Sequence, residues 1–165
     1  MYIVGIDPGR VYTNDEAVNK GKCPVAGTLG TTANGNVYKM VEVTTAQNLT
    51  EGLVVTISSS HKATVAATVQ PGTAIRELGI VRATATASAS SFIWAQVYGR
   101  GTVAVSSASA LPNVVLVMGI TPGMVDDGTP TSASAFIDGL TLTATSDVAG
   151  ALTAAIINWP MFSGQ

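Results

Sequence analysis

Short runs rich in β-branched and small residues recur along this chain, and turn residues separate them. Thr, Val, Ser and Gly are poor helix formers, and no long segment shows apolar residues at a sustained helical period. We therefore predict an all-β fold, a β-sandwich or β-barrel-like body with an extended N-terminal arm. The predicted strands are Leu53–Ser58, Ala63–Thr68, Leu78–Ala85, Phe92–Tyr98, Thr102–Val105, Val114–Ile120, Leu140–Thr145 and Leu152–Trp159.

The folded body is predicted to begin with a hairpin. Asn34-Gly35 lies between the runs 28–32 and 37–43, and Asn-Gly is the strongest short-range signal for a two-stranded turn. Residues 1–27 contain turn residues and little periodicity, so they are assigned to the arm. The predicted organisation is an arm over 1–27 and an oligomerising β-rich body over 28–165.

The segment Phe92–Tyr98 shows which side chains share a face of the sheet. Side chains alternate between faces along a strand, so the residues fall into two sets. One set is Phe92, Trp94, Gln96 and Tyr98, and the other is Ile93, Ala95 and Val97. Gly99-Arg100-Gly101 is predicted to turn this strand back on Thr102–Val105.

After Arg100 the chain contains no Lys, Arg or His. The whole chain is 11% charged and 47% hydrophobic, whereas a globular domain is typically about 25% charged. This predicts that much of the surface is covered by other chains. The net charge of −2 and eight scattered basic residues do not favour nucleic acid as a partner. The apolar runs are shorter than the roughly 20 residues of a membrane span, and Met1–Arg10 lacks the pattern of a signal peptide.

Few residues could support chemistry. Cys23 is the only cysteine and His61 the only histidine, so neither a disulfide nor a tetrahedral zinc site is predicted. His61 follows three serines and is assigned to a solvated turn. Asp126-Asp127-Gly128 lacks the ligand spacing of a known calcium loop and is predicted to be a turn. No catalytic residue, metal site or cofactor is assigned.

One motif suggests an enzyme. Tyr2-Ile3-Val4-Gly5-Ile6-Asp7-Pro8-Gly9 resembles the first strand of RuvC-type, ribonuclease H-like resolvases, in which the aspartate is a metal ligand. Such a nuclease also needs further carboxylates and a basic DNA channel. Because no basic residue follows Arg100, a metal-dependent nuclease is kept only as an alternative.

Three segments taken in order resemble the head decoration, or cement, proteins of tailed bacteriophages. They are Leu29-Gly30-Thr31-Thr32 with Asn34–Val41, Phe92–Gly99 followed by Thr102–Val105, and Ala155–Pro160. The resemblance implies a β-rich, non-catalytic protein that binds the major capsid protein on the outer surface of the phage head as a symmetric oligomer, expected to be a trimer. A tail, fibre or knob protein is the alternative among structural proteins.

Apolar residues of the arm and aromatic residues of the body are the candidate interface. They are Tyr2, Ile3, Val4, Ile6, Trp94, Tyr98 and Trp159. Aromatic residues in strands form either core or subunit contacts. If the arm reaches a neighbouring capsid subunit, deletion of residues 1–20 is expected to weaken capsid attachment and leave the oligomer folded.

Overall fold

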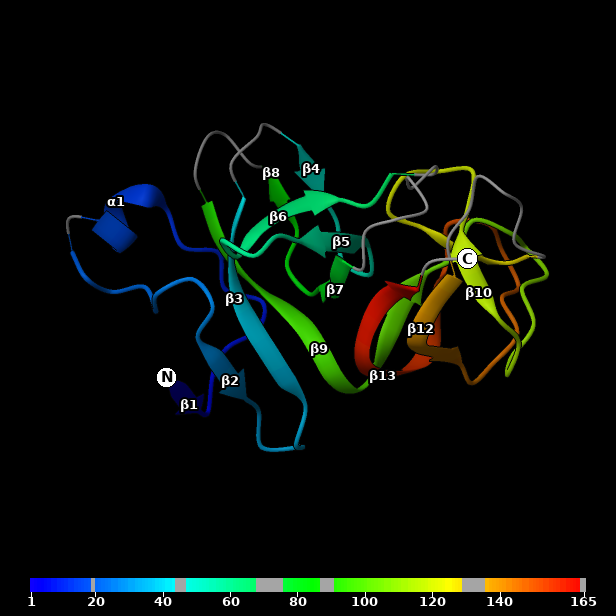
Figure 1. Ribbon diagram of the computed structural model, residues 1–165, viewed down its shortest axis with the longest axis horizontal. Coiled ribbons are helices and arrows are strands. Elements are labelled where there is room, and N and C mark those ends of the chain that lie inside the picture. Colours follow the sequence, from blue (N-terminus) through cyan, green and yellow to red (C-terminus); the bar gives the residue numbers. More distant parts are fainter. Residues whose placement is uncertain (19, 44–46, 68–75, 87–90, 129–135, 164–165) are drawn as a thin grey trace.

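The computed structural model describes residues 1–18, 20–43, 47–67, 76–86, 91–128 and 136–163 (Figure 1). The prediction of an all-β fold is confirmed, since these residues contain many strands and one short helix, α1 (Asn14–Val18). The strands are β1 (Tyr2–Val4), β2 (Leu29–Thr31), β3 (Val37–Val43), β4 (Asn48–Leu49), β5 (Val54–Ile57), β6 (Lys62–Val65), β7 (Arg76–Val81), β8 (Ala85–Thr86), β9 (Ser91–Ala104), β10 (Leu116–Met118), β11 (Val125–Asp127), β12 (Phe136–Leu142) and β13 (Leu152–Ser163).

Five strands close into a first barrel. The order of pairing is β3–β6–β5–β7–β9, and β9 pairs again with β3. Of these pairs only β3–β6 is parallel. Inward-facing residues such as Val41, Val55 and Ile93 form its core, because alternate side chains of each strand point to one side.

A second barrel lies beside the first and uses the other half of β9 (Figure 1). β9 pairs with β13, followed by β12, β10 and β11. A parallel bridge between Val105 and Val125 returns the sheet to the end of β9. The core of this barrel includes Leu116, Leu142 and Phe162. Strand β9 therefore belongs to both barrels.

The Asn-Gly hairpin is confirmed. Antiparallel strands β2 and β3 meet at the pair Thr31–Val37, and Gly35 has a φ of 83°. Glycine adopts this left-handed conformation without the steric cost that a Cβ atom imposes. The turn between β2 and β3 thus follows from local sequence alone.

The predicted turn at Gly99-Arg100-Gly101 is wrong. Strand β9 continues through these residues, and Gly99, with a φ of 106°, marks a bend inside it. The N-terminal part of β9 pairs with β3, whereas Tyr98–Ala104 pairs with β13. Pairing with a distant strand therefore keeps the chain extended where local sequence indicated a reversal.

The N-terminal segment lies against the first barrel. β1 pairs in parallel with β2, and Tyr12 forms a bridge with Phe92 of β9. Tyr12 also packs with Trp94 in a small cluster on the outer face of β3 and β9. Helix α1 begins with a capping box. The Glu16 carboxylate accepts a hydrogen bond from the Thr13 N–H at 3.0 Å, and the Glu16 N–H donates to the Thr13 hydroxyl at 3.3 Å. The bond from the Thr13 N–H lowers the pKa of Glu16.

Candidate functional site

The outer face of β13 carries apolar side chains where a barrel strand usually presents polar ones. Along Leu152–Ile157 the outward residues are Leu152, Ala154 and Ile156, and the alternate residues are buried. The row continues to Met161, which is 40% exposed. Because both faces of this strand are largely apolar, its outer face is suited to contact with another protein.

An irregular step between β12 and β13 brings Trp159 to this surface. The register between the two strands shifts between Asp138 and Leu140, and Trp159 has a φ of 49°. Thr153, Ala155 and Ile157 are buried, so strict alternation would also turn Trp159 inward. The left-handed conformation of Trp159 breaks that alternation and leaves its side chain 41% exposed.

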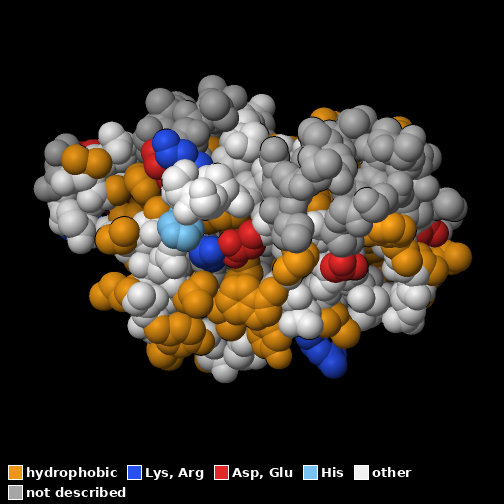
Figure 2. Space-filling model, viewed as in Figure 1, with side chains coloured by type: hydrophobic (Ala, Val, Ile, Leu, Met, Phe, Trp, Pro, Cys, Tyr) orange, Lys and Arg blue, Asp and Glu red, His pale blue; other side chains and the backbone are white. Residues whose placement is uncertain are grey.

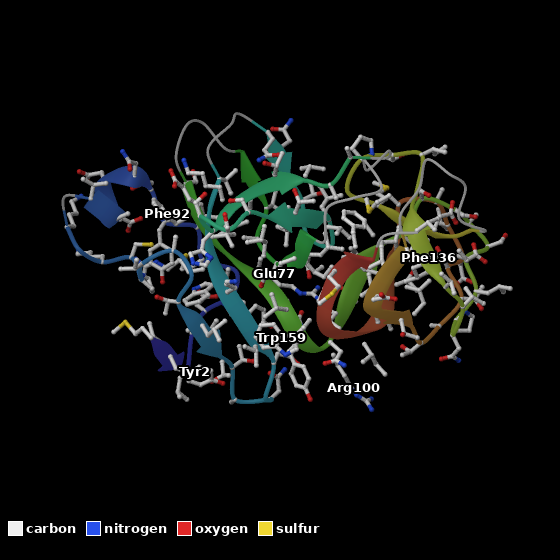
Figure 3. All side chains as sticks on the ribbon, in the orientation of Figure 1. Tyr2, Glu77, Phe92, Arg100, Phe136 and Trp159 are labelled. Atoms are coloured by element: carbon white, nitrogen blue, oxygen red, sulfur yellow. The ribbon has the colours of Figure 1, made fainter. Side chains whose placement is uncertain are left out.

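Tyr98 and Arg100 of β9 lie beside this row. A shallow hollow of about 310 Å³ is lined by Tyr98, Gly99, Arg100, Ile156, Ile157 and Asn158. Figure 3 shows Trp159 between Glu77 and Arg100, and Figure 2 shows hydrophobic side chains gathered below an adjacent pair of charges. That pair is Lys39 and Glu77, whose Nζ and Oε2 atoms are 2.6 Å apart. We call Tyr98, Arg100, Ile156, Trp159 and Met161 the β13 face.

Buried side chains hold the bend that presents Tyr98 and Arg100. Asn36 accepts a hydrogen bond from the Arg100 N–H at 3.0 Å and donates its amide N–H to the Arg100 carbonyl at 2.8 Å. Gln96 donates to the carbonyls of Tyr98 and Arg100 at 3.2 and 3.1 Å. These four bonds hold the β9 backbone at Tyr98 and Arg100 from the buried side of the strand.

Arg82 connects this network to the first barrel. Its Nε donates to Gln96 Oε1 at 2.6 Å, its Nη1 donates to Thr102 Oγ1 at 2.8 Å, and Glu51 lies 3.6 Å away. Burial lowers the pKa of Arg82 because it penalises the charged guanidinium. A Cβ atom on Gly101 would lie 1.8 Å from Arg82 Nη2, so any other residue there would displace the guanidinium from its present position.

The structure separates the sequence-predicted interface residues into three groups by their exposure. Tyr2, Val4, Tyr98 and Trp159 are exposed, whereas Ile3 and Ile6 are half-buried. Trp94 is fully buried, so its assignment to an interface is wrong. The predicted alternation in β9 was correct, but the face that carries Trp94 is covered by Tyr12 from the N-terminal segment.

Sequence reasoning missed Arg100, Ile156 and Met161. The available signal was the run Leu152–Ile157, where outward positions are apolar as well as inward ones. A strand that is apolar at outward as well as inward positions indicates that both of its faces are covered.

Asp7, His61 and Cys23, the residues considered for metal binding or catalysis, lie in turns or are partly buried. The exposed Asp7 carboxylate accepts a hydrogen bond from the Gly9 N–H at 3.0 Å and closes a turn. His61, with a φ of 60°, lies in a turn closed by Ser58, but it is half-buried against Gly27 rather than fully solvated. Burial raises the pKa of the Cys23 thiol to about 11, which keeps it protonated at neutral pH. Within the described ranges, no three His, Cys, Asp or Glu side chains are grouped so that they could hold a metal ion.

The acidic residues of the second barrel occupy two kinds of site. Asp138 is an exposed residue of β12 and Asp147 lies in an exposed loop segment. Asp126 and Asp127 belong to β11, so the prediction of a turn there is wrong. Asp126 accepts hydrogen bonds from the Ser106 hydroxyl and from the Asp127 N–H, both at 2.9 Å.

Replacing Asp126 by asparagine is expected to stabilise the protein slightly at neutral pH. Burial, and then the adjacent Asp127, raise the pKa of Asp126, so its ionisation in the folded state is unfavourable. Asparagine keeps an oxygen for the Asp127 N–H and an amide that can donate to Ser106. The expected gain is about 0.5 kcal/mol, because Asp126 is only partly buried and solvent screens its carboxylate.

The pH dependence of this gain identifies its cause. A raised pKa means that the native state loses stability as the pH rises from the unfolded pKa through the folded one. The asparagine variant should therefore be more stable in thermal melts at pH 7 and equal to the wild type near pH 3. An equal gain at both values would show that charge is not responsible.

Comparison with models of known protein families gives no match, and comparison with curated protein sequences gives none either. The part of the chain that the structure describes contains no helix long and apolar enough to cross a membrane.

Proposed function

We propose that this protein is a bacteriophage capsid decoration protein that binds the major capsid protein on the outer surface of the head and stabilises the shell by protein contacts. The exposed apolar surface of a weakly charged β-fold supports this proposal most directly. The segments that resemble decoration proteins also lie in the framework of the fold, in the β2–β3 hairpin, β9 and β13. The proposal assigns no catalytic step.

The capsid contact is assigned to the open edge of β1. The Leu29 N–H donates to the Met1 carbonyl and the Gly5 N–H donates to the Thr31 carbonyl, so alternate backbone groups of this segment point toward β2. By the same alternation those of Tyr2 and Val4 point away from it. No described strand pairs with that edge. An added strand from a capsid subunit would satisfy these groups.

Side chains beside the open edge add an apolar contribution. Tyr2 is 57% exposed and Val4 is 76% exposed. Burial of such side chains contributes about 25 cal/mol per Å² of apolar surface. A modest contact of this kind, repeated over a shell, provides a large total stabilisation.

The test is binding to phage heads that lack the protein. The double variant Tyr2→Ser with Val4→Ser should sediment with heads at least about tenfold less tightly than the wild type, a loss of about 1.4 kcal/mol. Val148→Ser removes another exposed valine, from the second barrel, and should bind normally. Absence of wild-type binding, or equal binding by all three proteins, would refute the assignment.

Point variants are preferable to the deletion of residues 1–20. That deletion would also remove Tyr12, which is buried against Trp94. Loss of head binding could then reflect an unfolded first barrel. Tyr2 and Val4 lie on the outer strand, so their replacement leaves that cluster intact.

A further inference from the structure

We infer that the β13 face binds a second copy of this chain, with Arg100 of one copy paired to Asp138 of the other. This inference rests on the oligomeric part of the proposed function and deepens it, and it concerns residues of β9, β12 and β13 rather than the open edge of β1. It rests on the apolar outer row of β13 and on two charges that flank this row.

Arg100 and Asp138 lie on opposite sides of β13. Arg100 of β9 is directly opposite Ile156, and Asp138 of β12 is directly opposite Met161. Directly opposed residues share a face of a sheet, so both charges border the row that contains Ile156 and Met161. One continuous surface therefore has a cation at one side, an anion at the other, and apolar and aromatic side chains between them.

Neither charge is neutralised within the copy. Both side chains are exposed, and the ion pairs among the described residues involve neither of them. A third charge, Glu77 of β7, also lies directly opposite Met161, but Lys39 already neutralises it within the copy. An apolar face with two unmatched charges at its borders is suited to a partner that carries the same charges in reverse.

A second copy supplies that arrangement. A two-fold axis across β13 would bring each Arg100 to the partner's Asp138 and would bury both apolar rows. In a closed ring each copy would instead offer Arg100 to one neighbour and Asp138 to the next. The charge distribution of the chain agrees with this, because residues 1–100 carry a formal charge of +2 and residues 101–165 carry −4.

The residue types of this face are those that dominate binding at protein interfaces. Tyr, Trp and Arg are enriched among residues whose truncation weakens association most. Trp159 itself adopts the left-handed conformation at the irregular step in β13, and Asn36 and Gln96 hold the backbone at Arg100. Both anchors are thus fixed before the second copy binds, which lowers the entropic cost of association.

Charge reversal tests the pairing. Arg100→Asp and Asp138→Arg should each weaken self-association at least roughly 30-fold, because each places like charges together. The double variant restores opposite charges and should recover most of the wild-type association. Sedimentation equilibrium of the full chain, without phage heads, gives the association constant and the number of copies.

Two control variants make the same changes of charge elsewhere. Lys62→Asp alters an exposed residue of β6, and Asp147→Arg alters an exposed residue of the second barrel outside the β13 face. Both should associate as the wild type does. Near-ultraviolet circular dichroism and thermal melts establish that each variant is folded.

The outcomes separate this inference from the proposed function. A monomeric wild-type protein, or single reversals that associate normally, would overturn the inference. Single reversals that abolish association without recovery in the double variant would also overturn the Arg100–Asp138 pairing. Binding to phage heads by a folded monomer would overturn only the self-association, whereas a normal oligomer that ignores heads would overturn only the capsid role.

Discussion

Replacing Trp94 by alanine is expected to lower the free energy of unfolding by about 3–5 kcal/mol. Trp94 is fully buried and packs with Tyr12, Tyr38 and Met40. Removing the indole leaves a cavity between the N-terminal segment and the first barrel. Because globular domains are stable by only about 5–15 kcal/mol, this change removes a large part of the total.

The loss should also be visible in the N-terminal segment. The side chain of Tyr12 contacts the same cluster, and its backbone pairs with Phe92. We expect limited proteolysis to cleave this segment in the variant at denaturant concentrations where the wild type resists. Urea unfolding measures the change in stability.

Trp159→Ala is the matched control for Trp94→Ala. The same atoms are removed, but Trp159 is 41% exposed and lies on the β13 face. The expected cost is about 1 kcal/mol or less. If the two variants lose equal stability, Trp94 does not have the structural role assigned to it.

Replacing Gln96 by leucine is expected to cost about 2–4 kcal/mol, the second-largest effect. The fully buried Gln96 is an acceptor for Arg82 Nε and a donor to the carbonyls of Tyr98 and Arg100. Leucine fills a similar volume but leaves the Arg82 Nε–H buried without that acceptor. The bend of β9 also loses two of its supporting bonds.

A double-variant cycle isolates the unpaired charge from the change in packing. Arg82→Met removes the guanidinium, so Arg82→Met with Gln96→Leu should be more stable than Gln96→Leu alone. Thr102→Val removes a single bond to Arg82 and should cost only about 1 kcal/mol. Strict additivity of the two single changes would contradict the account of Arg82 and Gln96 as one network.

The sequence predicted those features that depend on neighbouring residues. Asn34-Gly35 gave the hairpin correctly, because the turn needs only a residue that tolerates positive φ. The alternation in Phe92–Tyr98 gave the two faces of β9 correctly, since Ile93 lies in the barrel core and Trp94 on the opposite side.

The remaining features depend on residues far away in the sequence. The prediction of a turn at Gly99 failed because distant residues keep this segment extended. They are β13 and the Asn36 side chain, each more than 50 residues away in the sequence. The burial of Trp94 similarly depends on Tyr12. Trp159 is exposed, and the register shift that exposes it depends on pairing with β12. The last residue of the predicted strand Ala63–Thr68 lies outside the described part of the chain.

The sharing of β9 between the two barrels has a mechanical consequence. A force applied to one barrel reaches the other through the covalent backbone of the 14-residue strand β9, which pairs with β3 at one end and with β13 at the other. The pairing of β7 with β13 supplies a second, hydrogen-bonded connection. Two domains joined by a flexible linker would instead rotate before they transmitted tension. The two barrels are therefore expected to respond to tension as one rigid unit.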